Sequence, residues 1–300
     1  MPGTLHIDTG REMRGGQWQA LYLLEGLAKA GHRCTLAARD GSPLLERART
    51  NGLDARPLRL RELVRIAPSF DLIHAHDARA HLLAALLPRP FVVARRVGFP
   101  VRDSLASRWK YSRASHYIAV SHYVKSVLEA AQIPAEKIDV VYDGVPLPPA
   151  AQFHDRDRVV ALDSNDPGKG KSLIAEAARR AGIDIVFSHD LTADLGTAAL
   201  LVYITDSEGL GSAALLAMAA GVPVLASAVG GLVEAVEDGV TGLLIRDNSP
   251  DRIADGMLGM LQDRPRLEQL GRNARQKAER EFTTEQMVRN TLRVYEKVLA

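Results

Sequence analysis

The chain has a single cysteine, Cys34, among 300 residues. No disulfide can form within the chain, which is typical of a reducing compartment. Residues 1–7 lack the basic region and apolar stretch of a signal peptide, and no apolar run reaches membrane-spanning length. We therefore expect a soluble, cytoplasmic protein.

Strong charge of either sign is also lacking, since the formal net charge is only +2. This value argues against a general nucleic-acid binder. Two nucleotide-binding signatures are missing as well: residues 14–17 lack the G-x-G-x-x-G spacing, and residues 168–171 lack the Walker spacing. A hydrophobic content of 46% and this length permit two domains of ordinary size.

Short apolar runs alternate with helical patterns along most of the chain, which predicts parallel sheets covered by helices on both faces, an α/β fold. Predicted strands include residues 54–60, 71–75 and 222–226. Three prolines in residues 143–149 break the pattern and predict a linker. We predict an N-terminal domain (1–149), a C-terminal domain (150–283) and a final amphipathic helix (284–300).

The most informative stretch is residues 200–226, which read as strand, loop, helix and strand. Its loop contains Glu208, Gly209 and Gly211 just before the predicted helix. Unpaired N–H groups at a helix start carry partial positive charge, so the position suits a phosphate. A tight turn with Glu208 as a favourable helix-start charge is the simpler alternative.

Two further glycine-containing loops precede predicted helices. Gly15 and Gly16 permit close backbone approach to a bound molecule, although an ordinary turn would look the same. Lys169, between Gly168 and Gly170, is well placed for a diphosphate, or else lies in an exposed turn. Both are candidate binding loops.

Residues 74–77, His-Ala-His-Asp, end a predicted strand, where ligands bind in parallel sheets. Asp77 is either a site residue or a helix cap. His74 and His76 would point to opposite faces of a continuing strand, so we expect no metal site.

Residues 95–113 contain six Lys and Arg side chains, one Asp and three aromatic residues. The stretch suits an anionic acceptor or an anionic membrane surface. The alternative is a solvated helix face with its aromatic residues packed inward.

Several segments together resemble the group 1 (family 4) glycosyltransferases. The segments with this resemblance are residues 14–17, 27–32, 119–121, 140–145, 208–211, 217–227, 229–234 and 238–244. The resemblance implies the GT-B fold, with two Rossmann-like domains facing each other across a cleft and the last helix crossing back to the first domain. It also implies retaining transfer of a sugar from a nucleotide-diphosphate sugar, with no metal ion or other cofactor.

The resemblance also assigns roles to individual positions. Lys169 would contact the donor diphosphate, and Glu208 would contact the donor sugar. Other donor-binding positions it implies are Gly15, Gly16, Gly209, Leu210, Gly211 and Ser212. Weaker candidates for the acceptor side are His76, Asp77, Arg95 and Arg96.

Three positions depart from the family pattern. Leu216 replaces the second glutamate of the family's pair, Ser164 or a neighbour replaces an arginine, and Arg95 or Arg96 replaces a histidine. Residues 182–199 are also short for the usual strand–helix–strand passage, so the second domain is expected to be about one βαβ unit short.

We predict a metal-independent glycosyltransferase acting on a glycan or lipid-linked acceptor of the cell envelope, with peripheral contact at the inner face of the membrane as a further hypothesis. One alternative is a degenerate, non-catalytic GT-B protein that binds a sugar nucleotide or glycan. A sugar-nucleotide epimerase of the same fold is a third, less well-fitting interpretation.

Overall fold

A computed structural model describes residues 3–149 and 156–300. The chain forms two compact units, one of Met1–Gly144 with Thr284–Ala300 and the other of Val145–Thr283. The predicted boundary between residues 149 and 150 falls at a position outside the described residues and stays a prediction.

The N-terminal unit contains a seven-stranded parallel sheet in the order β3-β2-β1-β4-β5-β6-β7. Its strands are β1 (Thr4–Asp8), β2 (Cys34–Ala38), β3 (Ala55–Pro57), β4 (Leu72–Ala75), β5 (Phe91–Arg95), β6 (His116–Ala119) and β7 (Ile138–Val140). Strand order reverses between β1 and β4, which are hydrogen-bonded neighbours. Ligands bind at such a reversal, so the loops after β1 and β4 are the part of this unit to examine.

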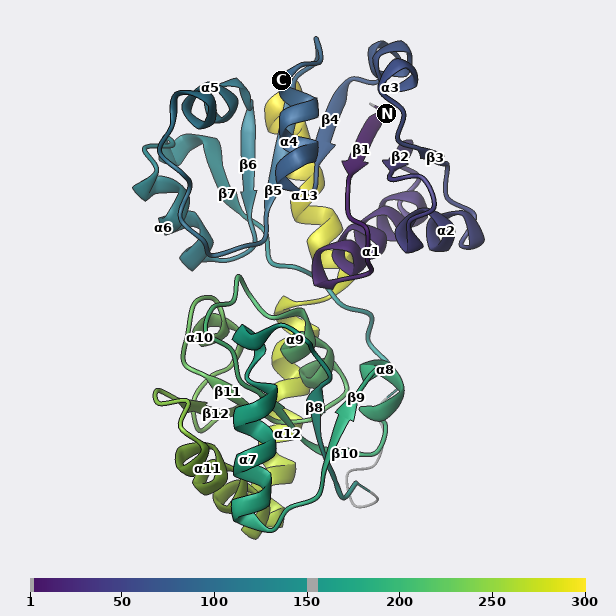
Figure 1. Ribbon diagram of the computed structural model, residues 1–300. Coiled ribbons are helices and arrows are strands. Elements are labelled where there is room, and N and C mark those ends of the chain that lie inside the picture. Colours follow the sequence, from purple (N-terminus) through teal and green to yellow (C-terminus); the bar gives the residue numbers. More distant parts are fainter. Residues whose placement is uncertain (1–2, 150–155) are drawn as a thin grey trace. The chain divides into compact units, whose positions relative to one another are not determined.

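Helices cover both faces of this sheet (Figure 1). They are α1 (Gly15–Lys29), α2 (Pro43–Thr50), α3 (Leu60–Ile66), η1 (Ala67–Ser69), α4 (Ala78–Ala85), α5 (Leu105–Arg113), α6 (His122–Ala130), η2 (Ala135–Lys137) and α13 (Thr284–Leu299). The buried Met287 and Tyr295 of α13 share one core with Leu27 of α1 and Val92 of β5. The end of the sequence thus completes the core of the first unit.

The C-terminal unit contains a five-stranded parallel sheet in the order β12-β11-β10-β8-β9. Its strands are β8 (Arg158–Leu162), β9 (Ile185–Ser188), β10 (Ala198–Tyr203), β11 (Val224–Ser227) and β12 (Gly242–Ile245). Here the order reverses between β8 and β10. The loops after these two strands carry Lys169 and Glu208, respectively.

Helices also flank this sheet. They are η4 (Pro167–Lys169), α7 (Lys171–Ala181), α8 (Leu191–Asp194), α9 (Ser212–Ala219), α10 (Leu232–Ala235), α11 (Pro250–Gln262) and α12 (Arg264–Glu281). Ile174 of α7 and Met257 of α11 are buried with Leu200 and Val202 of β10 in the main core of this unit.

Three predictions of local structure were wrong in extent. The strand predicted over residues 54–60 is limited to Ala55–Pro57, and Leu60 already begins α3. The strand predicted over residues 222–226 begins only at Val224, because Pro223 has no N–H to donate to the ladder. The helical spacing of the apolar residues in 20–28 predicts a buried stripe that includes Ala28, but Ala28 is exposed at the end of α1.

Candidate functional site

In the C-terminal unit, the two charged residues singled out from the sequence contact each other. Lys169 Nζ lies 2.7 Å from Glu208 Oε2, and their side chains are 27% and 17% exposed. The contact joins the loops after β8 and β10, which meet where the strand order reverses. A cation and a carboxylate are therefore held together at the edge of the sheet where ligands bind.

Glu208 has two further hydrogen bonds. Its Oε2 accepts from the Tyr203 hydroxyl at 2.5 Å, and its Oε1 accepts from the Gly209 N–H at 3.1 Å. Burial, then the neighbouring Glu208 carboxylate, raises the pKa of Tyr203 well above its usual value, so the hydroxyl stays protonated and donates. Tyr203 was not predicted as a site residue, because its position in an apolar strand resembles that of any core aromatic residue.

The two loops are also tied together through their backbones. Thr205 Oγ1 donates to the Gly168 carbonyl at 3.0 Å, and Asp206 N–H donates to the same carbonyl at 2.9 Å. Gly170 has a φ of +63°, and a Cβ there would lie 3.0 Å from the Ile204 carbonyl oxygen. A side chain at Gly170 would separate the loops, which explains why glycine follows Lys169.

Helix α9 begins directly after the loop that holds Glu208. Gly211 precedes it with a φ of +101°, and the first turn has neither an acidic residue nor a side-chain cap. Leu210 is 2% exposed, so this residue is buried in the packing of the loop. Ser212 is the first residue of the helix.

Gly231 supports this loop from the neighbouring segment. Its N–H donates to the Glu208 carbonyl at 3.0 Å, and a Cβ on Gly231 would lie 1.9 Å from the Gly209 carbonyl oxygen. No side chain fits in that space. Gly231 thus shapes the Glu208 loop.

The departures from the family pattern have ordinary surroundings. Leu216 lies on α9 and is half-buried. Ser164 Oγ accepts from the Asp166 N–H at 3.2 Å, within its own turn. Between α7 and β10 the structure has only β9 and the short α8.

In the N-terminal unit, the loop after β1 surrounds a buried carboxylate, Asp8. It is 1% exposed and accepts from the Gly10 N–H at 2.8 Å and from Gln17 Nε2 at 3.1 Å. Burial, then the charge of Asp77, raises the pKa of Asp8, although the hydrogen bonds from Gly10 and Gln17 oppose this shift. Asp8 was missed in the sequence, where it only ends a short strand.

Gly15 and Gly16 form the first turn of α1, which has no side-chain cap and no acidic residue. A Cβ on Gly16 would lie 4.0 Å from Cδ of Arg96, so the Arg96 side chain passes close to this turn. Asp77 caps α4, accepting from the backbone N–H groups of Arg79 and Ala80, and it also accepts from Thr9 Oγ1 at 2.8 Å. Asp77 is therefore a helix cap, and its role at the acceptor side stays a prediction.

The two predicted acceptor-side arginines lie in different surroundings. Arg96 Nε donates to Asp143 Oδ1 at 3.0 Å, and Arg96 Nη1 lies 3.3 Å from His76 Nδ1. Arg95 instead donates to the Tyr111 hydroxyl at 3.2 Å and to the Phe99 carbonyl at 2.5 Å. Arg95 thereby organises the segment that follows β5, and Arg96 belongs to the polar group at the end of β4.

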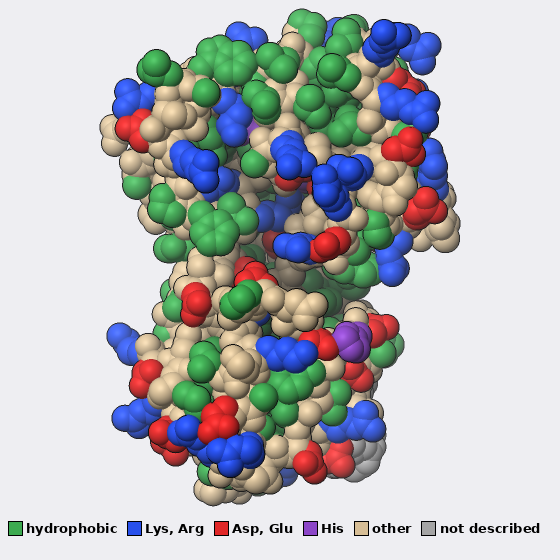
Figure 2. Space-filling model, in the orientation of Figure 1, with side chains coloured by type: hydrophobic (Ala, Val, Ile, Leu, Met, Phe, Trp, Pro, Cys, Tyr) green, Lys and Arg blue, Asp and Glu red, His purple; other side chains and the backbone are tan. Residues whose placement is uncertain are grey.

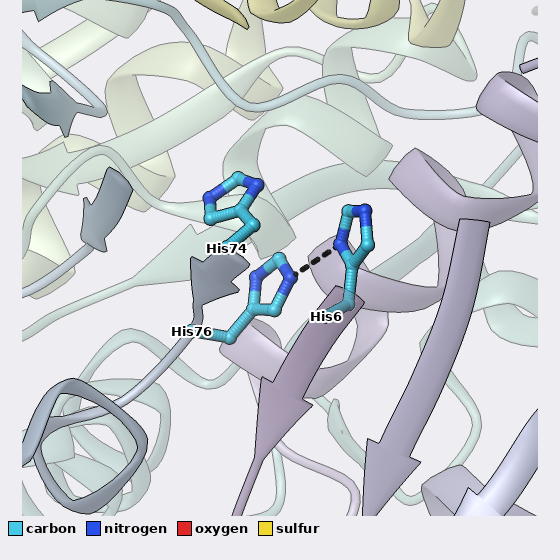
Figure 3. A group of neighbouring side chains, drawn as sticks. All are labelled: His6, His74 and His76. Atoms are coloured by element: carbon cyan, nitrogen blue, oxygen red, sulfur yellow. Dashed lines mark hydrogen bonds between the residues drawn. The ribbon is translucent and has the colours of Figure 1, made fainter. Parts of the chain in front are cut away.

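The expectation that His74 and His76 point to opposite faces was wrong. Their rings stack with centroids 4.3 Å apart, and His6 of β1 lies beside them (Figure 3). Side chains alternate along a strand, so residues two apart share a face, and the expectation misapplied this rule. His76 directly follows the end of β4 at Ala75 and keeps its ring on the same side as that of His74. His6 Nδ1 and His76 Nε2 are 2.9 Å apart and hydrogen-bonded.

The basic stretch is only partly packed. Phe99 and Trp109 are 61% and 45% exposed, and no residue of α5 is buried. Inward packing holds only for Tyr111, whose ring stacks on Tyr117 with centroids 5.7 Å apart. Figure 2 shows basic and hydrophobic side chains mixed over the region of α5.

Comparison with protein families matches each half of the chain to a glycosyltransferase model. Residues 13–147 match the model "Glycosyltransferase Family 4", and residues 165–277 match "Glycosyl transferases group 1". A D-inositol 3-phosphate glycosyltransferase of Kribbella flavida is 39% identical over an alignment of 151 residues that covers 47% of this chain and 35% of that protein. An uncharacterized glycosyltransferase of Methanocaldococcus jannaschii is 25% identical over 272 residues, with 76% of each chain covered.

Solved structures share the architecture at low sequence identity. HepE of Anabaena, crystallised with UDP-glucose, has a TM-score of 0.86 at 16% identity, covering 99% of this chain and 100% of that one. Sucrose-phosphate synthase of Thermosynechococcus elongatus has a TM-score of 0.76 at 17% identity, with 99% of each chain covered.

Two parallel-sheet units with these neighbours define the GT-B fold. With both halves matched by its models, the chain belongs to the group 1 (family 4) glycosyltransferases. The matches to the K. flavida relative and to a second one, from Nocardia farcinica, cover no more than about a third of each relative's length.

Proposed function

We propose that this chain transfers a sugar from a nucleotide-diphosphate sugar to an acceptor hydroxyl. The observation that carries the proposal is the Lys169–Glu208 pair at 2.7 Å, which joins two loops of the C-terminal unit, and the loop of Glu208 leads directly into α9. The ammonium group of Lys169 suits a diphosphate, and the carboxylate of Glu208 suits sugar hydroxyls. An ammonium group and a helix N-terminus beside one carboxylate match what such a donor presents.

The proposed chemistry follows from the charges of the reaction. When the bond between the anomeric carbon and the phosphate oxygen breaks, negative charge develops on the leaving diphosphate and positive charge on the sugar ring. Lys169 and the first turn of α9 stabilise the diphosphate, and Glu208 orients the sugar. Because Lys169 supplies the positive charge, the proposal includes no metal ion or cofactor.

We propose that the reaction proceeds with retention of configuration. The acceptor oxygen then attacks the same face of the sugar that the diphosphate leaves, and a phosphate oxygen of the leaving group takes the acceptor proton. No side chain is required as a general base in this route.

The proposed acceptor side is in the N-terminal unit, at Arg96 and His76, with Asp77 and Arg95 as supporting residues. Arg96 contributes a guanidinium next to the turn at Gly16, a group suited to anionic acceptors. The K. flavida relative is named for an inositol phosphate acceptor. We propose a phosphorylated glycan or lipid-linked acceptor of the cell envelope.

A thermal-shift titration tests donor binding directly. We expect UDP-glucose or GDP-mannose at ten times its Kd to stabilise the protein by about 1.4 kcal/mol, because a ligand that binds only the folded state shifts the unfolding equilibrium. Free glucose is the matched control and should have no effect. Absence of a shift with either sugar nucleotide, together with no hydrolysis of either, would refute the proposed function.

A non-catalytic sugar-nucleotide binder is the second candidate, and Leu216 and Ser164 favour it, because they replace polar family residues. The two candidates differ in one result. A binder would show the thermal shift without releasing UDP or GDP from the donor in the presence of acceptor extracts, whereas an enzyme would show both.

We further propose that α5 and the segment before it make peripheral contact with an anionic membrane. Phe99, Leu105 and Trp109 expose 61%, 84% and 45% of their surfaces. Basic residues of the same segment are Arg102, Arg108, Lys110 and Arg113. Aromatic side chains beside basic ones suit the interface of anionic lipids. Among the helices of residues 3–149 and 156–300, none is long and apolar enough to cross a bilayer.

Vesicle sedimentation tests this contact. We expect the protein to pellet with vesicles containing phosphatidylglycerol and to remain in the supernatant with pure phosphatidylcholine, because each basic residue near an anionic surface contributes about 1 kcal/mol. The double variant F99S/W109S should bind several-fold more weakly. The control is V64S. Val64 is also apolar and is 54% exposed, but it lies on α3 and not in this segment, so V64S should bind like the wild type. Equal binding by both variants, or by both lipids, would contradict the proposal.

A further inference from the structure

The three imidazoles of His6, His74 and His76 form an unusual group of side chains away from the donor loops, and the proposed chemistry gives no role to His6 or His74 (Figure 3). All three are buried, and one nitrogen of each lies within 4.8 Å of the others. His74 Nε2 has no hydrogen-bond partner among the described residues. Three neutral imidazoles are a common ligand set for zinc, so the first question is whether a metal fits.

Arg96 decides where the protons of this group lie. A guanidinium can only donate, so Arg96 Nη1, 3.3 Å from His76 Nδ1, requires a lone pair on that nitrogen. A neutral His76 therefore carries its proton on Nε2 and donates it to His6 Nδ1 at 2.9 Å. The same argument applies to the next imidazole in the series: a neutral His6 that accepts at Nδ1 carries its proton on Nε2.

The ordered hydrogen bonds continue along β1 from His6 to Thr4 and then to His32. His6 Nε2 donates to Thr4 Oγ1 at 3.1 Å, and the Thr4 hydroxyl then donates its own proton to His32 Nε2, also at 3.1 Å. Every donor in the series Arg96, His76, His6, Thr4 and His32 thus faces an acceptor. The result is a single directional chain of hydrogen bonds through the interior of the N-terminal unit.

A metal ion does not fit this arrangement. Coordination by His76 Nε2 would move the His76 proton to Nδ1, where it would oppose an N–H group of Arg96. The ion would also lie near the positive charge of Arg96. The group is therefore better described as a proton-ordered hydrogen-bond chain than as a ligand set.

Burial keeps the imidazoles of His6 and His76 neutral. Burial, then the charges of His32 and Arg96, lowers the pKa of His6 to about 3, and the pKa of His76 is also lowered, by burial, then His74 and Arg96. A second proton on His76 would remove the acceptor that Arg96 uses. The neutral state and the contact with Arg96 thus support each other.

We propose that His76 is a positioning residue for Arg96. The hydrogen bonds through His6 and Thr4 hold the His76 proton on Nε2, so that Nδ1 of His76 stays free to accept from Arg96. Asp143 holds Arg96 Nε, and His76 holds Nη1. Two fixed contacts on one planar group determine its orientation. This inference rests on the proposed function in one respect only, namely that Arg96 serves the acceptor.

Nitrogen-15 NMR of histidine-labelled protein at pH 7 tests the chain without any substrate. We expect His76 and His6 as the Nε2–H tautomer and His32 as the Nδ1–H tautomer. Either His76 or His6 found as the Nδ1–H tautomer would overturn the inference. So would stoichiometric binding of Zn²⁺ in calorimetry that disappears in His74→Ala.

Two amide variants test the positioning of Arg96. In His76→Asn the amide oxygen replaces the Nδ1 acceptor, whereas in His76→Gln the amide lies at the Nε2 position. We expect hydrogen exchange of the Arg96 guanidinium to be roughly 10-fold faster in His76→Gln than in the wild type and nearly unchanged in His76→Asn. Equal acceleration in both folded variants would overturn the inference. Because no substrate is used, an inactive protein would fail the proposed function and leave this result intact.

Discussion

Replacement of Lys169 with methionine is expected to lower the kcat of sugar transfer by about 10²–10³-fold. The assay uses the sugar nucleotide that the thermal-shift titration identifies as the donor. Loss of one group that stabilises a developing oxyanion typically has an effect of this size. Methionine keeps the length and most of the volume of lysine but removes the charge. Glu208 keeps its hydrogen bonds from Tyr203 and Gly209, so the loop is expected to hold its shape.

Lys171→Met is the matched control for this prediction. Lys171 lies two residues further along, is 40% exposed and pairs with Asp163. Its removal is expected to change kcat less than about 3-fold, since Lys171 is not placed at the donor and a partly exposed ion pair contributes little. Equal losses in both variants, or an unchanged kcat in Lys169→Met with circular dichroism as in the wild type, would refute the role of Lys169.

The second large effect is expected for Gly231→Ala, which should destabilise the C-terminal unit by about 3 kcal/mol and lower the affinity for the donor at least ~10-fold. Overpacking a filled site costs energy of this order. The new Cβ would lie 1.9 Å from the Gly209 carbonyl oxygen, and backbone cannot move aside as a flexible side chain can. The Glu208 loop must therefore shift. Urea unfolding and the thermal-shift titration measure the two effects.

Gly259→Ala provides the opposite case in the same unit. Gly259 lies inside α11, and a Cβ there meets nothing within 4 Å. Alanine is favoured over glycine within a helix, so this variant is expected to be more stable by about 0.5–1 kcal/mol. If both alanine variants changed stability in the same direction, the steric explanation for Gly231 would be wrong.

Much of the C-terminal site could be predicted from the sequence, because its determinants are local. Lys169 lies between two glycines and a glycine follows Glu208, and each loop follows an apolar run and precedes a helix. Alternating strands and helices also predict that the two loops reach the same edge of a parallel sheet. The contact between Lys169 and Glu208 therefore joins residues that the sequence had marked independently.

The rest of the site depends on contacts between distant parts of the chain. Asp143 reaches Arg96 across 47 positions, and His6 reaches His76 across 70. Neither Asp143 nor His6 lies in a motif that indicates a polar partner. The relation of His74 to His76, in contrast, could be predicted: residues two apart in a strand share a face, so the expectation of opposite faces misapplied the alternation rule.

Helix α13 has a consequence for how the protein is made. The core of the N-terminal unit includes Met287 and Tyr295, and Tyr295 also hydrogen-bonds His74 at 2.6 Å. On the ribosome, the whole C-terminal unit emerges before these residues do. The first half of the nascent chain therefore keeps apolar surface uncovered until residues 287–295 have been made and can complete its core. The C-terminal unit, Val145–Thr283, is one uninterrupted segment and can fold earlier.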